Sequence, residues 1–286
     1  MKPRPALRYF GGKWRLAPWI IGHFPDHVCY VEPFCGAASV FLRKRPAQFE
    51  VINDLDGEVV NFFRMLRDRT DEFIYAIQAT PYSRREYELA WEWENIGSEL
   101  DPLERARLFY IRSWQGWAFR EAQRGRGDVV VYPTWRIQHS NNRGKSVITD
   151  WNKVDHLPAL AGRLKMAFIE NDDAIDIIGR YDRPETLFYL DPPYLSELRS
   201  ERWRRAYHCE VDRDYHVRLL DLLMEIRGMA IISGYPSGLY NETLAGWHRF
   251  ETRSRTTNTS NPTTEVIWVS PSATEARLPL FQNCGV

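Results

Sequence analysis

The sequence has few cysteines, no net charge and no long apolar run. Its four cysteines (Cys29, Cys35, Cys209 and Cys284) are never spaced as Cys-x-x-Cys, and the seven histidines do not cluster with them, so the pattern indicates no zinc site. The chain lacks an apolar segment near its N-terminus, and it lacks the run of about 18 apolar residues that a membrane span needs. We therefore expect a cytoplasmic protein without a metal ion or a membrane partner.

The zero formal net charge excludes a global basic field, so any contact with nucleic acid must come from a local patch. The composition is otherwise that of an ordinary globular protein, with 44% hydrophobic and 27% charged residues. A length of 286 residues is enough for one large domain, or for one domain with a sizeable insertion.

Apolar runs alternate with helical patterns, which predicts an α/β fold. Strands are expected at 28–32, 49–53, 167–170, 187–190, 229–233, 250–253 and 266–269. Helices are expected at 13–24, 37–45, 151–164 and 212–225, with others ending near Arg67 and beginning at Asp173. Between them, residues 70–120 are mostly helical in pattern, and residues 121–150 contain glycines and a Val-rich run. We therefore expect one domain formed by residues 1–67 and 151–286, interrupted by an inserted domain at 68–150.

The step Asp191-Pro192-Pro193-Tyr194 follows the apolar run 187–190. Proline cannot continue a central strand, so Asp191 is expected at the carboxyl end of a strand, where open α/β sheets bind ligands. A carboxylate, the Pro192 carbonyl and the Tyr194 ring suit a planar substrate with an exocyclic amino group, because two acceptors meet its N–H groups and the ring stacks on it. The alternative is a proline-rich turn with a chance tyrosine.

Two further segments suggest a nucleoside-type ligand. Glu32-Pro33-Phe34-Cys35-Gly36 forms an expected strand-to-helix turn, in which Gly36 lets the backbone approach a ligand closely. It is not a phosphate loop, because the glycine patterns of such loops are absent. Asp54 ends the next strand and could bind ribose hydroxyls, or it could cap the following helix.

With Leu7-Arg8-Tyr9-Phe10-Gly11-Gly12-Lys13 at the start and Asp-Pro-Pro-Tyr last, these segments resemble the Dam-type DNA adenine-N6 methyltransferases, over roughly residues 4–67 and 160–270. The resemblance implies a Rossmann-like methyltransferase sheet with an inserted DNA-recognition domain. It also implies S-adenosylmethionine (SAM) as methyl donor and a flipped-out adenine in duplex DNA as acceptor. It assigns catalysis to Asp191, Pro192 and Tyr194. It assigns the SAM pocket to Tyr9, Lys13, Glu32, Pro33, Phe34, Gly36, Asp54, Asp173 (or its neighbour Asp172) and Asp191.

Two basic segments are candidates for DNA contact. Residues 112–145 hold seven basic residues against two acidic ones, interleaved with Trp and Tyr, and we single out Arg124, Arg126 and Arg136 as readers of base edges. Residues 199–205 follow the catalytic motif, so Arg202, Arg204 and Arg205 are expected on phosphates. The plain alternative for either segment is a solvated helix face.

Three competing functions are weighed against this one. Cytosine-N4 methyltransferases usually carry Ser where Asp191 stands, and relatives that modify protein glutamine carry Asn. A catalytically inactive DNA-binding module is the third, and the complete pocket motifs argue against it. The recognition sequence stays open, because residues 112–120 depart from those associated with GATC. A cognate restriction enzyme is one expected partner, and an orphan or phage enzyme without such a partner is the alternative.

Overall fold

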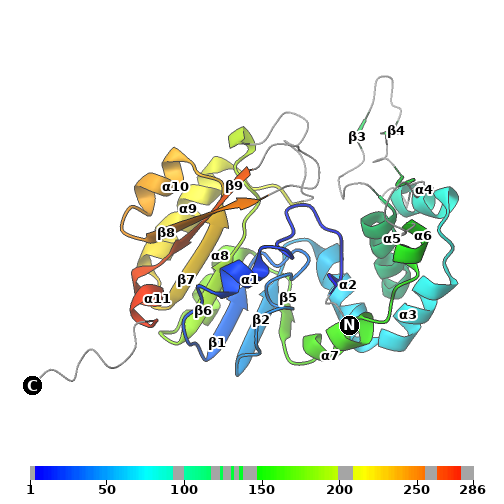
Figure 1. Cartoon of the computed structure of the whole chain (residues 1–286), viewed down its shortest axis with the longest axis horizontal. Coiled ribbons are helices and arrows are strands. Elements are labelled where there is room, and N and C mark those ends of the chain that lie inside the picture. The colour runs from blue at the N-terminus through cyan, green and yellow to red at the C-terminus, as the bar shows by residue number, and fades with distance from the viewer. Residues whose placement is uncertain are drawn as a thin grey trace, which may run out of the picture.

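The computed structural model describes residues 4–92, 100–116, 123–124, 130–131, 135–137, 147–198, 209–254 and 263–277. Within these ranges a seven-stranded sheet carries helices on both faces (Figure 1). In spatial order its strands are β5 (Phe168–Glu170), β2 (Phe49–Asn53), β1 (Cys29–Glu32), β6 (Thr186–Leu190), β7 (Met229–Gly234), β9 (Thr263–Val269) and β8 (His248–Ser254). The expected α/β class and all seven expected strands are confirmed.

The order in which the chain adds strands to the sheet switches from one side of β1 to the other. β1 pairs in parallel with both β2 and β6, so the chain first runs outward through β2 to β5 and later continues on the other side through β6 and β7. The carboxyl ends of β1 and β6, at Glu32 and Leu190, are therefore neighbours at a topological switch point, where open α/β sheets bind ligands. β9 runs antiparallel to its neighbours β7 and β8.

Side chains alternate between two cores along each strand, as the period of two in a strand requires. In β6, Leu187 and Tyr189 face one core and Phe188 and Leu190 face the other. All five residues of β6 are buried because helices cover both faces. The first core includes α1 (Ala17–Ile21), α2 (Gly57–Asp68), α7 (Leu157–Leu164) and α11 (Pro271–Glu275). The second includes α8 (Ala174–Tyr181), α9 (Arg213–Glu225) and α10 (Gly238–Thr243).

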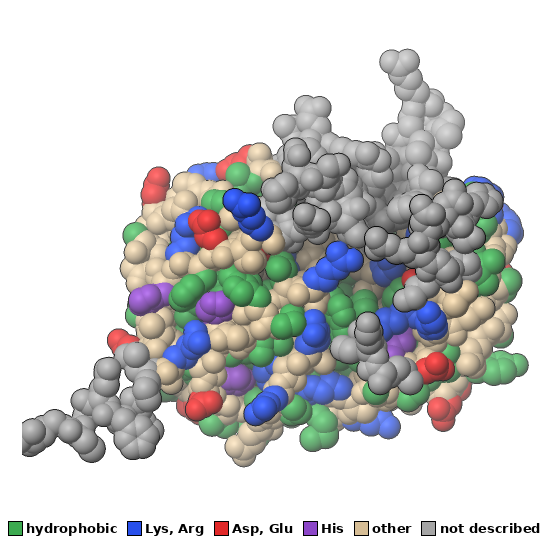
Figure 2. Space-filling model, viewed as in Figure 1, with side chains coloured by type: hydrophobic (Ala, Val, Ile, Leu, Met, Phe, Trp, Pro, Cys, Tyr) green, Lys and Arg blue, Asp and Glu red, His purple; other side chains and the backbone are tan. Residues whose placement is uncertain are grey.

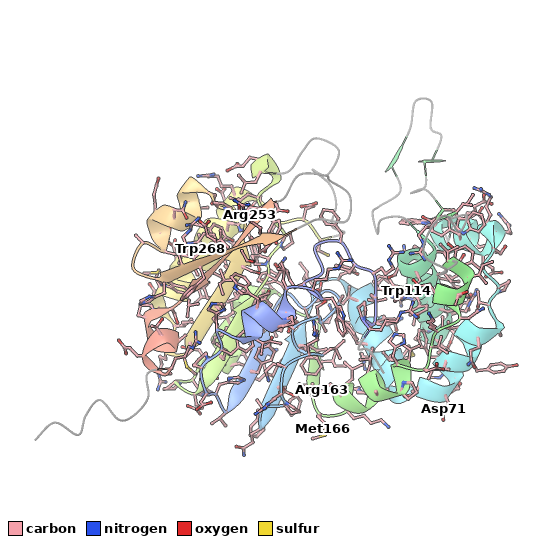
Figure 3. The ribbon with its side chains drawn as sticks, viewed as in Figure 1. Asp71, Trp114, Arg163, Met166, Arg253 and Trp268 are labelled. Atoms are coloured by element: carbon pink, nitrogen blue, oxygen red, sulfur yellow. The ribbon has the colours of Figure 1, made fainter. Side chains whose placement is uncertain are left out.

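A helical lobe stands beside this sheet (Figure 1). It contains α3 (Thr70–Ala79), α4 (Arg84–Glu92), α5 (Pro102–Gln115) and α6 (Val147–Trp151), and a short antiparallel pair of β3 (Gln123–Arg124) and β4 (Val130–Val131). The first core is continuous from Tyr30 of the sheet through Phe62 of α2 to Tyr110 of α5. Trp114 of α5 lies on the side of the lobe that faces the sheet, and its indole N–H donates to the Ala6 carbonyl at 3.1 Å (Figure 3). The helical pattern expected of residues 70–120 is confirmed where these residues are described. The status of residues 68–150 as a separate inserted domain stays a prediction.

The expected helix at 37–45 is wrong, because these residues form successive turns. Gly36 and Ala38 have positive φ values of 46° and 49°, which a right-handed helix cannot contain. The N–H of Phe41 donates to the Glu32 carboxylate at 2.9 Å instead of to a helical carbonyl. The helix expected at 13–24 is also shorter than predicted, since only α1 forms there. None of the described helices is both long and apolar enough to cross a bilayer.

Candidate active site

Asp191 comes directly after β6, at the switch point of the sheet. Two donors hold one of its carboxylate oxygens: Lys13 Nζ lies 2.8 Å from Oδ1, and the Ser233 hydroxyl donates to the same atom at 2.9 Å. The Asp191 side chain is 19% exposed and lines the pocket, so the carboxylate is held at Oδ1 while it faces a ligand. The two prolines that follow stiffen the loop.

Lys13 lies in the loop before α1, with only 5% of its side chain exposed. Its ammonium also donates to the Tyr194 hydroxyl at 2.5 Å and to the Gly11 carbonyl at 3.1 Å. The loop is closed by the N–H of Gly12, which donates to the Tyr9 carbonyl at 3.2 Å. Lys13 thus reaches back to two carboxylates, those of Asp191 and Glu265, and its contact with a cofactor stays a prediction.

Tyr194 is packed into the protein, with 7% of its surface exposed. Its hydroxyl donates to Glu265 Oε1 at 2.7 Å, and its ring lies 4.3 Å from the ring of Tyr235 at an angle of 49°. The segment Ser233–Tyr235 thus lies beside the Asp-Pro-Pro-Tyr motif. The stacking of a base on Tyr194 stays a prediction.

A pocket of about 810 Å³, including its open mouth, lies at the carboxyl ends of β1 and β6. Gly36 is the tight point of its wall, because a Cβ there would lie 3.1 Å from Tyr9 Cε1 and its φ of +46° strains any other residue. Within the described part of the chain, no three His, Cys, Asp or Glu side chains are grouped to hold a metal ion. The pocket brings together most of the residues expected to bind the cofactor: Tyr9, Lys13, Glu32, Pro33, Phe34, Gly36, Asp54 and Asp191.

Asp54 stands on the pocket wall, where its carboxylate accepts the backbone N–H groups of Gly36 at 2.8 Å and of Asp56 at 2.9 Å. It does not cap α2; that position belongs to Asp56, which accepts the N–H of Glu58 at 2.9 Å. The helix-cap alternative for Asp54 is therefore wrong. Burial raises the pKa of Asp54 to about 7, since desolvation outweighs the two backbone donors.

Glu32 forms the buried floor beneath the pocket. It accepts the Tyr30 hydroxyl at 2.7 Å and the N–H of Phe41 at 2.9 Å, yet burial raises its pKa to about 8. Two acids whose pKa values are raised by burial favour a cationic ligand, because a positive charge nearby stabilises their ionised forms.

Asp173 lies beside the pocket and does not line it. Its carboxylate caps α8 by accepting the N–H of Ile175 at 2.8 Å, and it accepts the Tyr215 hydroxyl at 2.9 Å. Asp172 instead pairs with Arg180 at 2.8 Å, away from the pocket wall. The ring of Tyr215 does line the pocket and lies 6.5 Å from that of Phe34. Sequence reasoning missed Tyr215, because a single tyrosine in the first turn of a helix carries no motif.

Glu265 is the second residue that sequence reasoning missed. It stands in β9, 4% exposed, and connects Lys13 and Tyr194 from the far side of the motif. A signal was available, since an acid inside a run of β-branched and apolar strand residues needs a partner when it is buried.

The residues expected on DNA are placed only in part. Arg136 is buried in the helical lobe, where its guanidinium lies 3.7 Å from Asp150 and its backbone N–H donates to the Gln115 carbonyl. These contacts give it a structural role, and its reading of a base stays a prediction. Five further predictions lie outside the described residues: the side chain of Arg124, and Arg126, Arg202, Arg204 and Arg205.

Comparison with known proteins narrows the class of enzyme. Residues 9–115 match the family model of the D12 class N6 adenine-specific DNA methyltransferases. The chain is 27% identical over 250 residues to the DNA adenine methylase of Escherichia coli (strain K12), which covers 84% of each chain. It is 35% identical over 114 residues to the DNA adenine methylase of Haemophilus influenzae, and this match covers 38% of this chain and 39% of that relative. A Type II methyltransferase of Lactococcus lactis subsp. cremoris is 24% identical over 235 residues, 78% and 77% of the two chains.

The sheet and its switch-point pocket define a Rossmann-like methyltransferase. Within that class, the family model over residues 9–115 and the likeness over 84% of the chain support a DNA adenine-N6 methyltransferase of the Dam type. Its substrate is DNA, and the family implies SAM as the methyl donor.

Proposed function

We propose that Asp191 and the Pro192 carbonyl bind the amino group of an adenine rotated out of duplex DNA, and that this nitrogen receives the methyl group. The observation that carries the proposal is the position of the Asp191 carboxylate, which Lys13 and Ser233 hold at Oδ1 and which lines the pocket with 19% of its side chain exposed. It lies next to a pocket whose residues fit SAM.

The fit rests on four features of the pocket. Gly36 leaves room for the amino-acid end, Asp54 offers a carboxylate to the ribose hydroxyls, and the rings of Phe34 and Tyr215 flank space for a planar base. Glu32 adds negative charge opposite a cationic ligand once it ionises. When bound, SAM supplies a methyl group activated by its sulfonium leaving group.

The protein contributes to the chemistry by making the amino nitrogen of adenine a better nucleophile toward the methyl group. Adenine N6 is a weak nucleophile because its lone pair is delocalised into the ring. Acceptors on both N–H groups favour a pyramidal nitrogen, and they stabilise the positive charge that develops in the transition state more than they stabilise the ground state. The same carboxylate can take the proton that the methylated nitrogen loses. Alignment of the nitrogen with the methyl group adds to the rate.

The base must leave the helix before it can reach Asp191, and Tyr194 with Tyr235 offers aromatic surface beside the motif. Lys and Arg side chains lie in the middle of the face shown in Figure 2, between the sheet and the helical lobe. This placement supports a DNA path across that face, with residues 112–145 reading sequence and residues 199–205 on phosphates.

The Type II name of the Lactococcus relative supports a place in a restriction–modification pair, in which a cognate endonuclease reads the same site. Such an enzyme acts where the DNA of a bacterial or phage-infected cell lies, in the cytoplasm. Sequencing that detects N6-methyladenine in DNA from expressing cells identifies the site and tests whether it is GATC.

The direct test is Asp191→Ala, assayed with unmethylated genomic DNA and SAM, with the methylated nucleoside identified by mass spectrometry. We expect N6-methyladenine from the unmodified enzyme, and a loss of turnover on the order of 10²-fold or more in the variant. Thermal melting should be kept. Asp71→Ala is the matched control, because this exposed carboxylate lies at the outer edge of the helical lobe (Figure 3). Near-normal turnover in Asp191→Ala, or N4-methylcytosine as product, would contradict the proposal.

A further inference from the structure

Glu265 is a buried acid that the mechanism above does not use. It lies in β9, an antiparallel strand at the far side of β7 from the Asp-Pro-Pro-Tyr motif, and it is 4% exposed. It does not line the pocket. An acid in such a place needs a partner, because an unpaired buried carboxylate is costly.

Its partners lead directly to the catalytic carboxylate. The Tyr194 hydroxyl donates to Glu265 Oε1 at 2.7 Å, and Lys13 Nζ lies 3.5 Å from the same oxygen. Lys13 in turn donates to the Tyr194 hydroxyl at 2.5 Å and lies 2.8 Å from Asp191 Oδ1. One ammonium and one hydroxyl thus connect two carboxylates from different strands.

The charge balance of this cluster matters for the reaction. A lysine that is neutralised by Asp191 alone would draw that carboxylate into a closed ion pair and weaken its other oxygen as an acceptor. When Lys13 is shared with an ionised Glu265, the cluster keeps one net negative charge. That charge lies beside the nitrogen that becomes positive during methyl transfer.

We propose that Glu265 is a positioning residue for methyl transfer: through Lys13 and the Tyr194 hydroxyl it fixes Asp191 and keeps the cluster negative. The inference rests on the proposed function, because it assigns to Asp191 the binding of the adenine amino group. Glu265 itself does not line the pocket, and its role requires no contact with the substrate.

The pH dependence follows from the groups that face Glu265. Burial raises the pKa of Glu265, Asp191 raises it further, and Lys13 and Tyr194 lower it. Tyr189 also interacts with Glu265, and burial raises the pKa of Tyr189, so that it stays neutral near neutral pH. Protonation of Glu265 as the pH falls should therefore slow the reaction at a pH above the ordinary range for a glutamic acid.

The test is single-turnover methyl transfer to unmethylated genomic DNA as a function of pH, at a SAM concentration that saturates the enzyme at every pH, with Glu265→Gln as a permanent mimic of protonated Glu265. We expect the variant to bind SAM within about twofold of the unmodified enzyme and to transfer the methyl group about tenfold more slowly above neutral pH, equal to about 1.4 kcal/mol. Its rate should stay flat where the unmodified enzyme loses activity. Glu251→Gln, on the neighbouring strand β8 and exposed, is the control and should keep the normal profile.

Tyr194→Phe is the second variant, since it removes the connecting hydroxyl and keeps both the ring and the charge of Glu265. This variant should lower the rate of methyl transfer and should still lose activity as the pH falls, as the unmodified enzyme does. The proposal is overturned if Glu265→Gln transfers the methyl group at the normal rate, or if its rate falls at low pH as that of the unmodified enzyme does. If that variant fails to fold, a normal rate in Tyr194→Phe overturns it and a lowered rate supports it. Failure of the unmodified enzyme to make N6-methyladenine would refute the proposed function instead.

Discussion

Lowering the pH should weaken the binding of SAM, because Asp54 must be ionised to accept the ribose hydroxyls. Burial raises the pKa of Asp54 from 3.8 to about 7 in the free protein, so the protonated form is favoured below that pH. A ligand that donates hydrogen bonds to the carboxylate favours the ionised form and lowers its pKa. The sign is therefore fixed: the contribution of Asp54 to SAM affinity is present above about pH 7 and is lost as the pH falls below that value.

The magnitude follows from this pKa of about 7. If SAM binds only to the ionised form, the apparent dissociation constant rises about twofold at about pH 7 and about tenfold at about pH 6, relative to its plateau. Calorimetric titration with SAM across this range measures it directly. The ionisation of Glu32, whose pKa is about 8, adds a dependence of the same sign, because a cationic ligand favours its charged form as well.

Asp54→Asn isolates the contribution of Asp54, because the titrations of Glu32 and of the ligand's own amino group are common to both proteins. We expect the variant to bind SAM more weakly at about pH 8 by roughly 1.5–3 kcal/mol, the value of a hydrogen bond to a charged group. The ratio of the two affinities should shrink as the pH falls. A ratio that stays constant from about pH 8 to about pH 6 would refute the assignment of a titrating Asp54 to the cofactor site.

Two further predictions concern the pocket wall and the DNA contacts. Gly36→Ala should weaken SAM binding by about tenfold or more and lower the melting temperature, because the new Cβ meets Tyr9 at 3.1 Å and the φ of Gly36 is +46°. The control is Gly162→Ala in α7, where a Cβ meets nothing within 4 Å, and this variant should bind SAM normally. Replacing Arg202, Arg204 and Arg205 by Ala should weaken all DNA alike and reduce the salt slope by about one unit per lost phosphate contact. At least one single change among Arg124, Arg126 and Arg136 should relax site choice by roughly 1–3 kcal/mol on a randomised oligonucleotide pool. A changed preferred site in the triple variant, with none in the single variants, would contradict this division.

The strands could be predicted from the sequence because each has a short apolar run that ends in a polar or turn-forming residue. Asp191 illustrates why the site was visible too: a carboxylate before two prolines marks the carboxyl end of a strand in any α/β sheet. Asp54 and Gly36 follow from the same logic applied to β2 and β1. The pocket was thus predictable wherever a site residue adjoins the end of a strand.

Other parts were not predictable, because they depend on contacts between distant segments. The turns at 37–45 look helical in composition, yet the Glu32 carboxylate takes the N–H of Phe41 and two positive φ values break the helix. Arg136 looks like a DNA contact in a basic segment, yet it is buried beside Asp150. Glu265 lies 74 positions after Asp191 and reaches it only through Lys13 from the other end of the chain.

The three acids with raised pKa values share a physical logic. Glu32 and Glu265 are buried and Asp54 is half-buried, and desolvation raises the pKa of each. In the free enzyme, this lets the fold avoid the cost of several unpaired charges, because a buried acid can stay protonated. A cationic methyl donor and a nitrogen that becomes positive both favour the ionised forms. Charge complementarity is then strongest when both substrates are in place and the transition state forms, which is where stabilisation accelerates a reaction.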